Sequence, residues 1–338
     1  MRNKLQQLKK SLPGLKEKVL LKNYTTFGIG GPADFFYRAK SVPDLINAVK
    51  LCRRLGIDFF ILGGGSKLLV SDSGFRGLVI KNQSSEIKIL KNNRIKVASG
   101  VTNQALVSFC REHGLTGAEF LVGIPGTVGG AIKYNARFRD PRSFLEYFVD
   151  FHAVKDCFMG DLVESIKLLL PDDRVVTRGR RYCQFDYHTS GLRSVFQKKD
   201  DIILEAVLKF DRADPDQINQ AIKKISLWRL TRKVGQKTRN SDSFTGGLNP
   251  QPRGKSAGCI FSNIPNKWNH PVGRMIDLCG LKGARAGGAE ISEAHANFII
   301  NDNNATAEDV VKLIKIAKKA VKKKFGVELE EEVRYIGF

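Results

Sequence analysis

The sequence predicts an α+β fold, and three observations support that prediction. Some segments hold short, continuous apolar runs typical of buried strands, whereas others repeat apolar residues at the spacing of an amphipathic helix. The two kinds of segment follow one another irregularly, and no internal repeat is evident, which argues against a repeat array. The chain has 338 residues, of which 42% are hydrophobic and 9% aromatic, so it can bury the cores of two or three domains and is not globally disordered.

The first segment, residues 1–83, predicts strands around a capped helix. Its first 22 residues are basic and weakly amphipathic and predict one short helix. Ser41 is placed to cap a second helix, which Gly56 ends. The apolar positions of that helix are Leu45, Ile46, Val49, Cys52 and Leu55. Strand-like runs occupy residues 33–39, 59–62, 68–70 and 78–80.

The remaining two segments, residues 84–212 and 213–338, follow seams near residues 83 and 212. The middle segment predicts a hairpin of residues 86–90 and 94–98 around Asn92 and Asn93, a helix from Thr102 to Gly114, and strands over much of residues 145–210. The last segment predicts a helix from Pro215, followed by a polar loop or flap over 230–257. A short helix over 270–280 and a strand over 295–301 come next. The segment ends with a helix from Thr306 to Phe325, which has Asp309 in a capping box, and a strand over 327–336.

Composition limits the class of protein. The 56 Lys and Arg residues exceed the 34 Asp and Glu residues by +22, which would suit nucleic acid, an anionic membrane surface or a polyanionic small molecule, or serve solubility alone. No apolar run is long enough to span a bilayer, and the N-terminal residues lack the apolar centre of a signal peptide, so we expect a cytosolic, cytoplasmic protein without membrane insertion.

Cysteine and lysine placement adds two expectations. The six cysteines lie far apart, without a CxxC pair or a histidine at zinc-ligand spacing, so we expect reduced thiols and no metal site. The lysines of the expected C-terminal helix form a solvated outer face or, alternatively, a docking patch. They are Lys312, Lys315, Lys318, Lys319, Lys322, Lys323 and Lys324.

Two glycine clusters are the clearest signals of a ligand. Residues 63–66, Gly-Gly-Gly-Ser, follow a strand-like run, where backbone N–H groups can contact a phosphate. The next residues open another strand, and the spacings of a Rossmann or Walker loop are absent. A pyrophosphate nest between two strands or plain turn glycines remain as explanations. The second cluster, residues 123–130, favours one extended dinucleotide lying across two lobes.

In order along the chain, several motifs together resemble those of the MurB family, the UDP-N-acetylenolpyruvoylglucosamine reductases or UDP-N-acetylmuramate dehydrogenases. They are NYTTFGIGGPA (23–33), LGGGSKLLVSD (62–72), GIPGTVGGA (123–131), SAGCIFSN (256–263), GGA (287–289), EAHANF (293–298) and LEEEVRYIG (329–337).

The resemblance implies an oxidoreductase of peptidoglycan synthesis. It implies a PCMH-type FAD-binding fold with lobes at 1–83 and 84–212, then a C-terminal α/β substrate-binding domain at 213–338. NADPH would reduce non-covalent FAD, and hydride would pass to the enolpyruvyl double bond of the UDP-sugar while a protein acid protonates the adjacent carbon. The many phosphates that visit such a cleft would account for part of the basic charge. We expect a monomer and no nucleic-acid partner.

Individual roles also follow from the resemblance. Cys259 occupies the proton-donor position, usually a serine, and a thiol can serve as an acid at neutral pH; a buried, inert cysteine is the alternative. Glu332 matches the catalytic glutamate, and without the motif it would be solvated surface charge. Tyr187, Asn263 and His295 match substrate contacts, although a lone histidine is more often structural. The expected FAD-binding residues are Gly63, Gly64, Gly65, Ser66, Lys67, Leu68, Ile124, Pro125, Gly126, Thr127, Gly129 and Gly130.

His188 is the main departure from the family pattern, which has arginine there, facing the developing enolate and carboxylate. A neutral imidazole carries no fixed charge. Either nearby carboxylates keep His188 protonated, or Arg181 or Arg193 replaces the arginine, or the site is slow. Three further departures are Lys67 in place of asparagine, residues 135–138 in place of glycine-rich sequence, and a longer stretch over 239–255.

Three hypotheses follow. The chain is an active reductase, of the shorter type because residues 190–202 leave no room for an extra substrate loop. Alternatively, it is an FAD-binding homologue whose catalysis is altered or lost because of His188. A basic nucleic-acid binder is the distant third, since no recognition module is evident.

Overall fold

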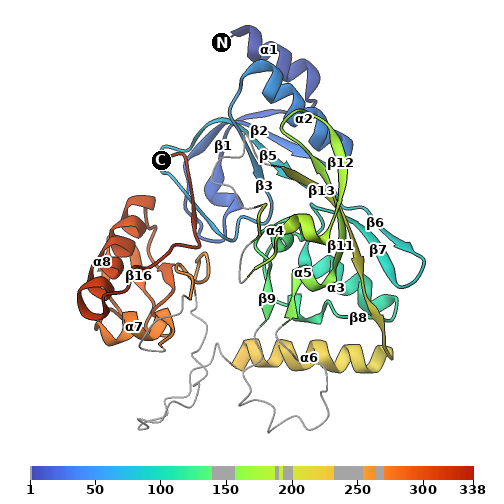
Figure 1. Ribbon diagram of the computed structural model, residues 1–338. Coiled ribbons are helices and arrows are strands. Elements are labelled where there is room, and N and C mark those ends of the chain that lie inside the picture. The colour runs from blue at the N-terminus through green and yellow to red at the C-terminus, as the bar shows by residue number, and fades with distance from the viewer. Residues whose placement is uncertain (1, 139–156, 187–189, 193–200, 232–253, 264–269) are drawn as a thin grey trace.

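The computed structural model describes residues 2–138, 157–186, 190–192, 201–231, 254–263 and 270–338. Helices and sheets mix irregularly along these residues, so the predicted α+β class is confirmed (Figure 1). No helix among them is long and apolar enough to cross a membrane. The first glycine loop directly follows a strand of one larger sheet, and the second is bonded to the end of a strand of the other, since the Gly129 N–H donates to the Ser99 carbonyl.

The first sheet carries the first glycine loop. Its strands, in pairing order, are β1 (Lys16–Leu20), β2 (Pro32–Ala39), β5 (Phe75–Asn82) and β3 (Phe59–Leu62). β1 runs antiparallel to β2, and the other pairs are parallel. The predicted helix is confirmed as α2 (Val42–Leu55), which begins at a Ser41 capping box and ends at Gly56 with φ 62°. Its buried Leu45 and Val49 share a core with Leu8 of α1 (Arg2–Ser11).

The single helix expected over residues 1–22 is wrong in its second half. α1 stops at Ser11, and β1 and the 3₁₀ turn η1 (Leu21–Tyr24) follow. Pro13 cannot continue a helix, and Gly14 adopts φ 82°. The basic residues after this break therefore form an edge strand along β2.

The second sheet is antiparallel throughout and supports the second glycine loop. Its strands, in pairing order, are β12 (Val175–Gly179), β11 (Val163–Leu169), β13 (Ile202–Lys209), β7 (Arg94–Ala98) and β6 (Ile87–Leu90). The predicted hairpin between β6 and β7 is confirmed, and Asn92 and Asn93 turn it with φ values of 57° and 55°.

Helices pack beside this second sheet (Figure 1). They are α3 (Asn103–Glu112), the short α4 (Val128–Lys133) and α5 (Met159–Leu162), and α6 (Pro215–Thr231). The remaining short elements are β8 (Leu115–Thr116), η2 (Glu119–Leu121), β9 (Arg137–Phe138), β10 (Cys157–Phe158), η4 (Arg180–Cys183) and β14 (Asp211–Arg212). α6 begins after the seam expected near residue 212, yet its Ile222 and Ile225 pack against the core of this middle segment.

The C-terminal segment is a small three-stranded sheet with two helices. Its elements are α7 (Val272–Leu278), β15 (Arg285–Ala286), β16 (Ala289–Ile291), β17 (Ile299–Asn301) and α8 (Ala307–Phe325). The predicted capping box of Thr306 and Asp309 is confirmed at the start of α8. The strand expected over 295–301 is too long, because Phe298 N–H bonds back to the His295 carbonyl in a turn.

The strand expected over 327–336 is also shorter than predicted, and its position matters for the site. Only β18 (Arg334–Ile336) forms, and it pairs in parallel with β4 (Leu68–Val70), directly after the first glycine loop. Just before β18, the Glu332 N–H donates to the Ile260 carbonyl at 2.8 Å. Three distant parts of the chain therefore meet at this loop.

Candidate functional site

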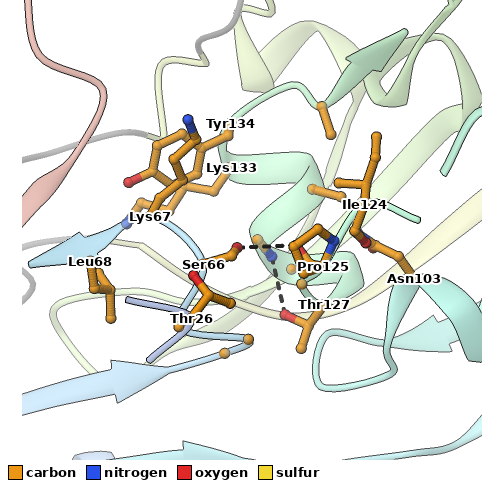
Figure 2. Close-up of a pocket in the computed structure, with 18 of the residues that line it drawn as sticks. Thr26, Ser66, Lys67, Leu68, Asn103, Ile124, Pro125, Thr127, Lys133 and Tyr134 are labelled. Atoms are coloured by element: carbon orange, nitrogen blue, oxygen red, sulfur yellow. Dashed lines mark hydrogen bonds between the residues drawn. The ribbon is translucent and has the colours of Figure 1, made fainter. Parts of the chain in front are cut away.

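A cavity of about 450 Å³ opens where the two glycine loops face each other (Figure 2). It is lined by all twelve residues expected to bind the cofactor: Gly63, Gly64, Gly65, Ser66, Lys67, Leu68, Ile124, Pro125, Gly126, Thr127, Gly129 and Gly130. Ser256, Ala257, Gly258, Phe298 and Glu332 add a wall from the C-terminal segment. The structure thus brings both predicted glycine clusters and one predicted catalytic residue to a single hollow.

The first loop joins β3 to β4 and touches the second loop through its glycines. A Cβ at Gly64 would lie 2.5 Å from the Cα of Gly126, so no larger residue fits without moving one loop. Ser66 Oγ donates to the Pro125 carbonyl at 3.0 Å, which fixes the two loops together (Figure 2). Lys81 of β5 donates to the Gly63 carbonyl, and burial, with the nearby Arg38 as a second cause, lowers the pKa of Lys81.

The second loop leads into α4. Thr127 caps this helix, since its Oγ1 accepts a bond from the Gly130 N–H at 3.4 Å. The loop is held from behind as well, because the Asn103 N–H donates to the Gly126 carbonyl at 3.2 Å. Backbone groups of both loops therefore line the cavity on a rigid support.

Two cavity residues that the sequence did not single out carry buried polar atoms. Thr26 Oγ1 and Asn103 Oδ1 are buried and have no hydrogen-bond partner among the described residues. A buried polar atom without a partner is costly, so a bound ligand that donates to Asn103 Oδ1 and donates to or accepts from the Thr26 hydroxyl would stabilise this arrangement. Thr26 lies in the first quoted motif, whereas Asn103 had no local signal beyond its place next to a helix cap.

The cavity wall is predominantly basic. Its charged residues are Lys67, Lys133, Arg137, Arg229 and Arg334 against Asp201 and Glu332. Such an excess of positive charge in a hollow favours anionic ligands. Arg229 comes from α6, and no motif could have placed it here.

Glu332 and Cys259 are linked through Lys67. The Lys67 ammonium lies 2.6 Å from Glu332 Oε2 and donates to the Cys259 carbonyl at 2.8 Å. The Glu332 residue is buried, with 7% of its surface exposed, and Cys259 is half-buried. Cys259 follows the lining residue Gly258 but does not itself line the cavity. Its backbone bridges to Phe298, which does.

Asn263 and His295, the expected substrate contacts, do not line the cavity. The Asn263 side-chain oxygen accepts a bond from the Val272 N–H at 2.9 Å, at the start of α7. His295 Nδ1 accepts a bond from the Asn297 N–H at 3.2 Å, and its ring lies 5.0 Å from that of Phe298. Both side chains therefore make local contacts within the C-terminal segment.

Tyr187, His188 and Arg193 lie outside the described residues. Their described neighbours are anchored near the end of α4: Asn135 donates to the Asp186 carbonyl at 2.9 Å, and Ser190 donates to the Lys133 carbonyl at 2.8 Å. Arg181 is exposed and does not line the cavity. No metal-ligand cluster of three or more His, Cys, Asp or Glu residues occurs in the part of the chain that the structure describes.

Two family models match the chain. Residues 250–336 match the UDP-N-acetylenolpyruvoylglucosamine reductase C-terminal domain, and residues 33–137 match an FAD binding domain. The second match contains both glycine loops and Asn103, and the first contains Cys259 and Glu332.

Individual proteins are similar over nearly the whole chain. A UDP-N-acetylenolpyruvoylglucosamine reductase from Caldanaerobacter subterraneus is 34% identical, over 94% of this chain and 92% of that protein. One from Geotalea uraniireducens is 36% identical, over 93% and 91% of the two chains. The crystal structure of UDP-N-acetylenolpyruvylglucosamine reductase (MurB) from Thermus caldophilus matches with a TM-score of 0.69 and 30% identity, covering 95% of this chain and 99% of that one.

Proposed function

The chain belongs to the MurB family of UDP-N-acetylenolpyruvoylglucosamine reductases, and from this premise we propose that it is an NADPH- and FAD-dependent enzyme of the cytoplasm. Its reaction would convert UDP-N-acetylglucosamine enolpyruvate to UDP-N-acetylmuramate, a peptidoglycan precursor. The observation that carries the proposal is the cavity shared by both glycine loops and Glu332.

The residues of the cavity fit FAD. The N–H groups of the first glycine loop can bind its phosphates, whereas the Ile124, Val128 and Gly129 N–H groups of the second loop already donate within the protein. The buried Asn103 Oδ1 can accept a hydrogen bond from the cofactor, and the buried Thr26 hydroxyl can donate or accept one. The basic wall would favour the charges of FAD, NADPH and the UDP-sugar in turn. Bound FAD would supply the two-electron chemistry, accepting hydride from NADPH and delivering it to the enolpyruvyl double bond.

Cys259 would complete the reduction by giving its thiol proton to the carbon next to the one that receives hydride. Hydride and proton together saturate the double bond, and solvent then returns a proton to the thiolate. Glu332 would polarise the double bond or stabilise the enol form. The Lys67 contacts to both residues support this pairing, because they hold the Cys259 backbone and the Glu332 carboxylate at one wall.

The domain roles belong to the same proposal. Residues 1–83 and 84–212 would form the two flavin lobes, each with its own sheet. Because α6 packs on the core of the middle segment, the substrate domain would begin after Thr231 rather than at residue 213. The substrate domain would consist of the C-terminal helices and the three-stranded sheet.

An absorption spectrum followed by two additions tests the proposed function. Purified protein should be yellow with non-covalent flavin, NADPH should bleach it without oxygen, and the enolpyruvyl UDP-sugar should restore the colour. A colourless protein that cannot be reconstituted with FAD would refute the proposal.

Altered catalysis is the second candidate, and the His188 departure favours it. In that case the protein would hold FAD without turning over the UDP-sugar. The variant His188→Arg distinguishes the causes: rescue of turnover would assign the deficit to position 188, and no rescue would point to a different reaction on the same flavin scaffold.

A further inference from the structure

Lys67 connects three parts of the chain that the proposed reaction needs together. Its backbone belongs to the first glycine loop, while its ammonium contacts the Cys259 carbonyl and the Glu332 carboxylate. Resting on the proposed function, we infer that Lys67 is a positioning residue that fixes Glu332 and the backbone of Cys259 against the loop that would hold the flavin.

The side-chain geometry supports this role over that of a mobile rim charge. Lys67 Nζ lies 2.6 Å from Glu332 Oε2, and the two side chains are 28% and 9% exposed. An ammonium has three donors, and these two contacts occupy two of them. Among the described residues, Lys67 is the partner of the Glu332 carboxylate, so its removal leaves a nearly buried charge unpaired.

Backbone pairing alone does not fix the carboxylate. The Glu332 N–H donates to the Ile260 carbonyl at 2.8 Å, and the Arg334 N–H donates to the Lys67 carbonyl at 2.9 Å. These bonds bring the segments side by side but leave the side-chain torsions of Glu332 free. The ion pair with Lys67 selects one rotamer and directs it toward the cavity wall.

Lys67 was expected to contact the cofactor because it lies in the first glycine loop. Its side chain adds a second function, which is to position Glu332 and the Cys259 backbone. It also places an ammonium group beside Glu332 without any contribution from position 188. Neither Arg181 nor Arg193 is needed for a cation at this wall.

Lys318 and Glu331 offer a matched control. Their ammonium and carboxylate are also 2.6 Å apart, and Glu331 is the immediate neighbour of Glu332. This pair joins the segment to α8, which contains Lys318, and neither residue lines the cavity. Lys318→Met therefore removes an ion pair of the same length from the same segment without touching the site, while Glu331 keeps the Tyr335 hydroxyl as a donor.

Hydrogen exchange of the full chain, with whatever flavin it retains, tests whether the Lys67 contacts hold the C-terminal segment in place. This measurement does not require turnover. In Lys67→Met we expect the amides of residues 328–338 to exchange about tenfold faster than in the parent, because the segment opens more often. Lys318→Met should change them less than about twofold. Equal effects of the two variants, or none, would overturn the inference.

A double-mutant cycle tests whether Lys67 acts through Glu332. We expect Lys67→Met to slow reoxidation of the reduced flavin by the UDP-sugar about 100-fold, as small displacements of reacting groups do. The double variant Lys67→Met with Glu332→Gln should be no slower than Glu332→Gln alone, within about threefold. Additive losses would refute the positioning role.

The hydrogen-exchange and kinetic experiments distinguish failure of the proposed function from failure of the positioning role of Lys67. If the parent protein does not reduce the UDP-sugar, the proposed function fails, while hydrogen exchange still decides whether Lys67 ties the segments together. If Lys67→Met does not fold, Lys67→Gln, which keeps a donor and loses the charge, takes its place in both experiments.

Discussion

At the scale of single residues, the site depends on a few side chains whose neighbours set their chemistry. Cys259 is half-buried, and its carbonyl is held by Lys67, whereas Cys52, Cys110 and Cys183 are fully buried. Cys157 and Cys279 are also partly buried, but only Cys259 among the described cysteines directly follows a residue that lines the cavity, Gly258.

Cys259→Ala should separate the two half-reactions. Removing the thiol removes the proposed acid, so reoxidation of the reduced flavin by the UDP-sugar should fall by about 100-fold or more, while reduction by NADPH continues. Stopped-flow absorbance of the flavin measures both steps. Cys259→Ser, which keeps an O–H donor, is the control; equal rates for all three proteins in the second step would exclude Cys259 as the donor.

The buried thiols predict a loss of stability at alkaline pH. Burial raises the pKa of the Cys110 thiol to about 12, with a smaller contribution from Glu119. In the unfolded chain the pKa of a thiol is about 8.5. The stabilisation is therefore complete below that pH and is lost as pH rises toward the folded value.

Urea denaturation between about pH 9 and pH 11 measures this effect. Cys110→Ala should flatten the decline of the unfolding free energy by about 1.4 kcal/mol per pH unit, whatever its cost in packing at neutral pH. Parallel curves for the parent and the variant would contradict the prediction.

At the scale of elements, the glycine loops work as a pair because their backbones approach closely at Gly64 and Gly126, beside the Ser66 bond to the Pro125 carbonyl. A methyl group at Gly64 would lie 2.5 Å from the Cα of Gly126 and must push the loops apart. Gly64→Ala should therefore weaken FAD binding at least about tenfold and cost about 1–3 kcal/mol of stability. Flavin fluorescence titration and denaturation measure the two effects. Gly179→Ala, where an added Cβ meets nothing within 4 Å, should change neither.

Local sequence signals predicted the elements that have their own start and stop residues. Ser41 with Gly56 and Thr306 with Asp309 bounded their helices correctly, since a cap acts within a few residues. The strand expected over 327–336 was too long because residues 330–332 bond to residues 260–262 whereas β18 pairs with β4, two partners that no local pattern could show.

The same distinction applies to the site. Both glycine clusters were recognisable from composition, and they line the cavity together. Arg229 and Asn103 reach it only because α6 and α3 pack where they do, and the Lys67–Glu332 pair joins residues 265 positions apart. Contacts of this kind depend on the whole fold, so the sequence alone could not predict them.

At the scale of the whole molecule, the chain has a net charge of +22, and the wall of the cavity is basic as well. Both charges attract anionic ligands to the cavity. Attraction of NADPH to that hollow should be screened by salt. We expect its second-order rate of flavin reduction to fall about tenfold between about 20 mM and about 500 mM NaCl. Stopped-flow measurements at several NADPH concentrations give this rate, and a rate insensitive to salt would show that the charge serves another purpose.

The parallel pairing of β4 with β18 has a consequence for biosynthesis. β4 leaves the ribosome long before β18, so the edge beside the first glycine loop stays open while most of the chain is still being made. Such long-range closure slows folding and leaves an unpaired strand exposed to wrong partners in the meantime. Stable retention of the flavin should therefore be among the last properties that the newly made chain acquires.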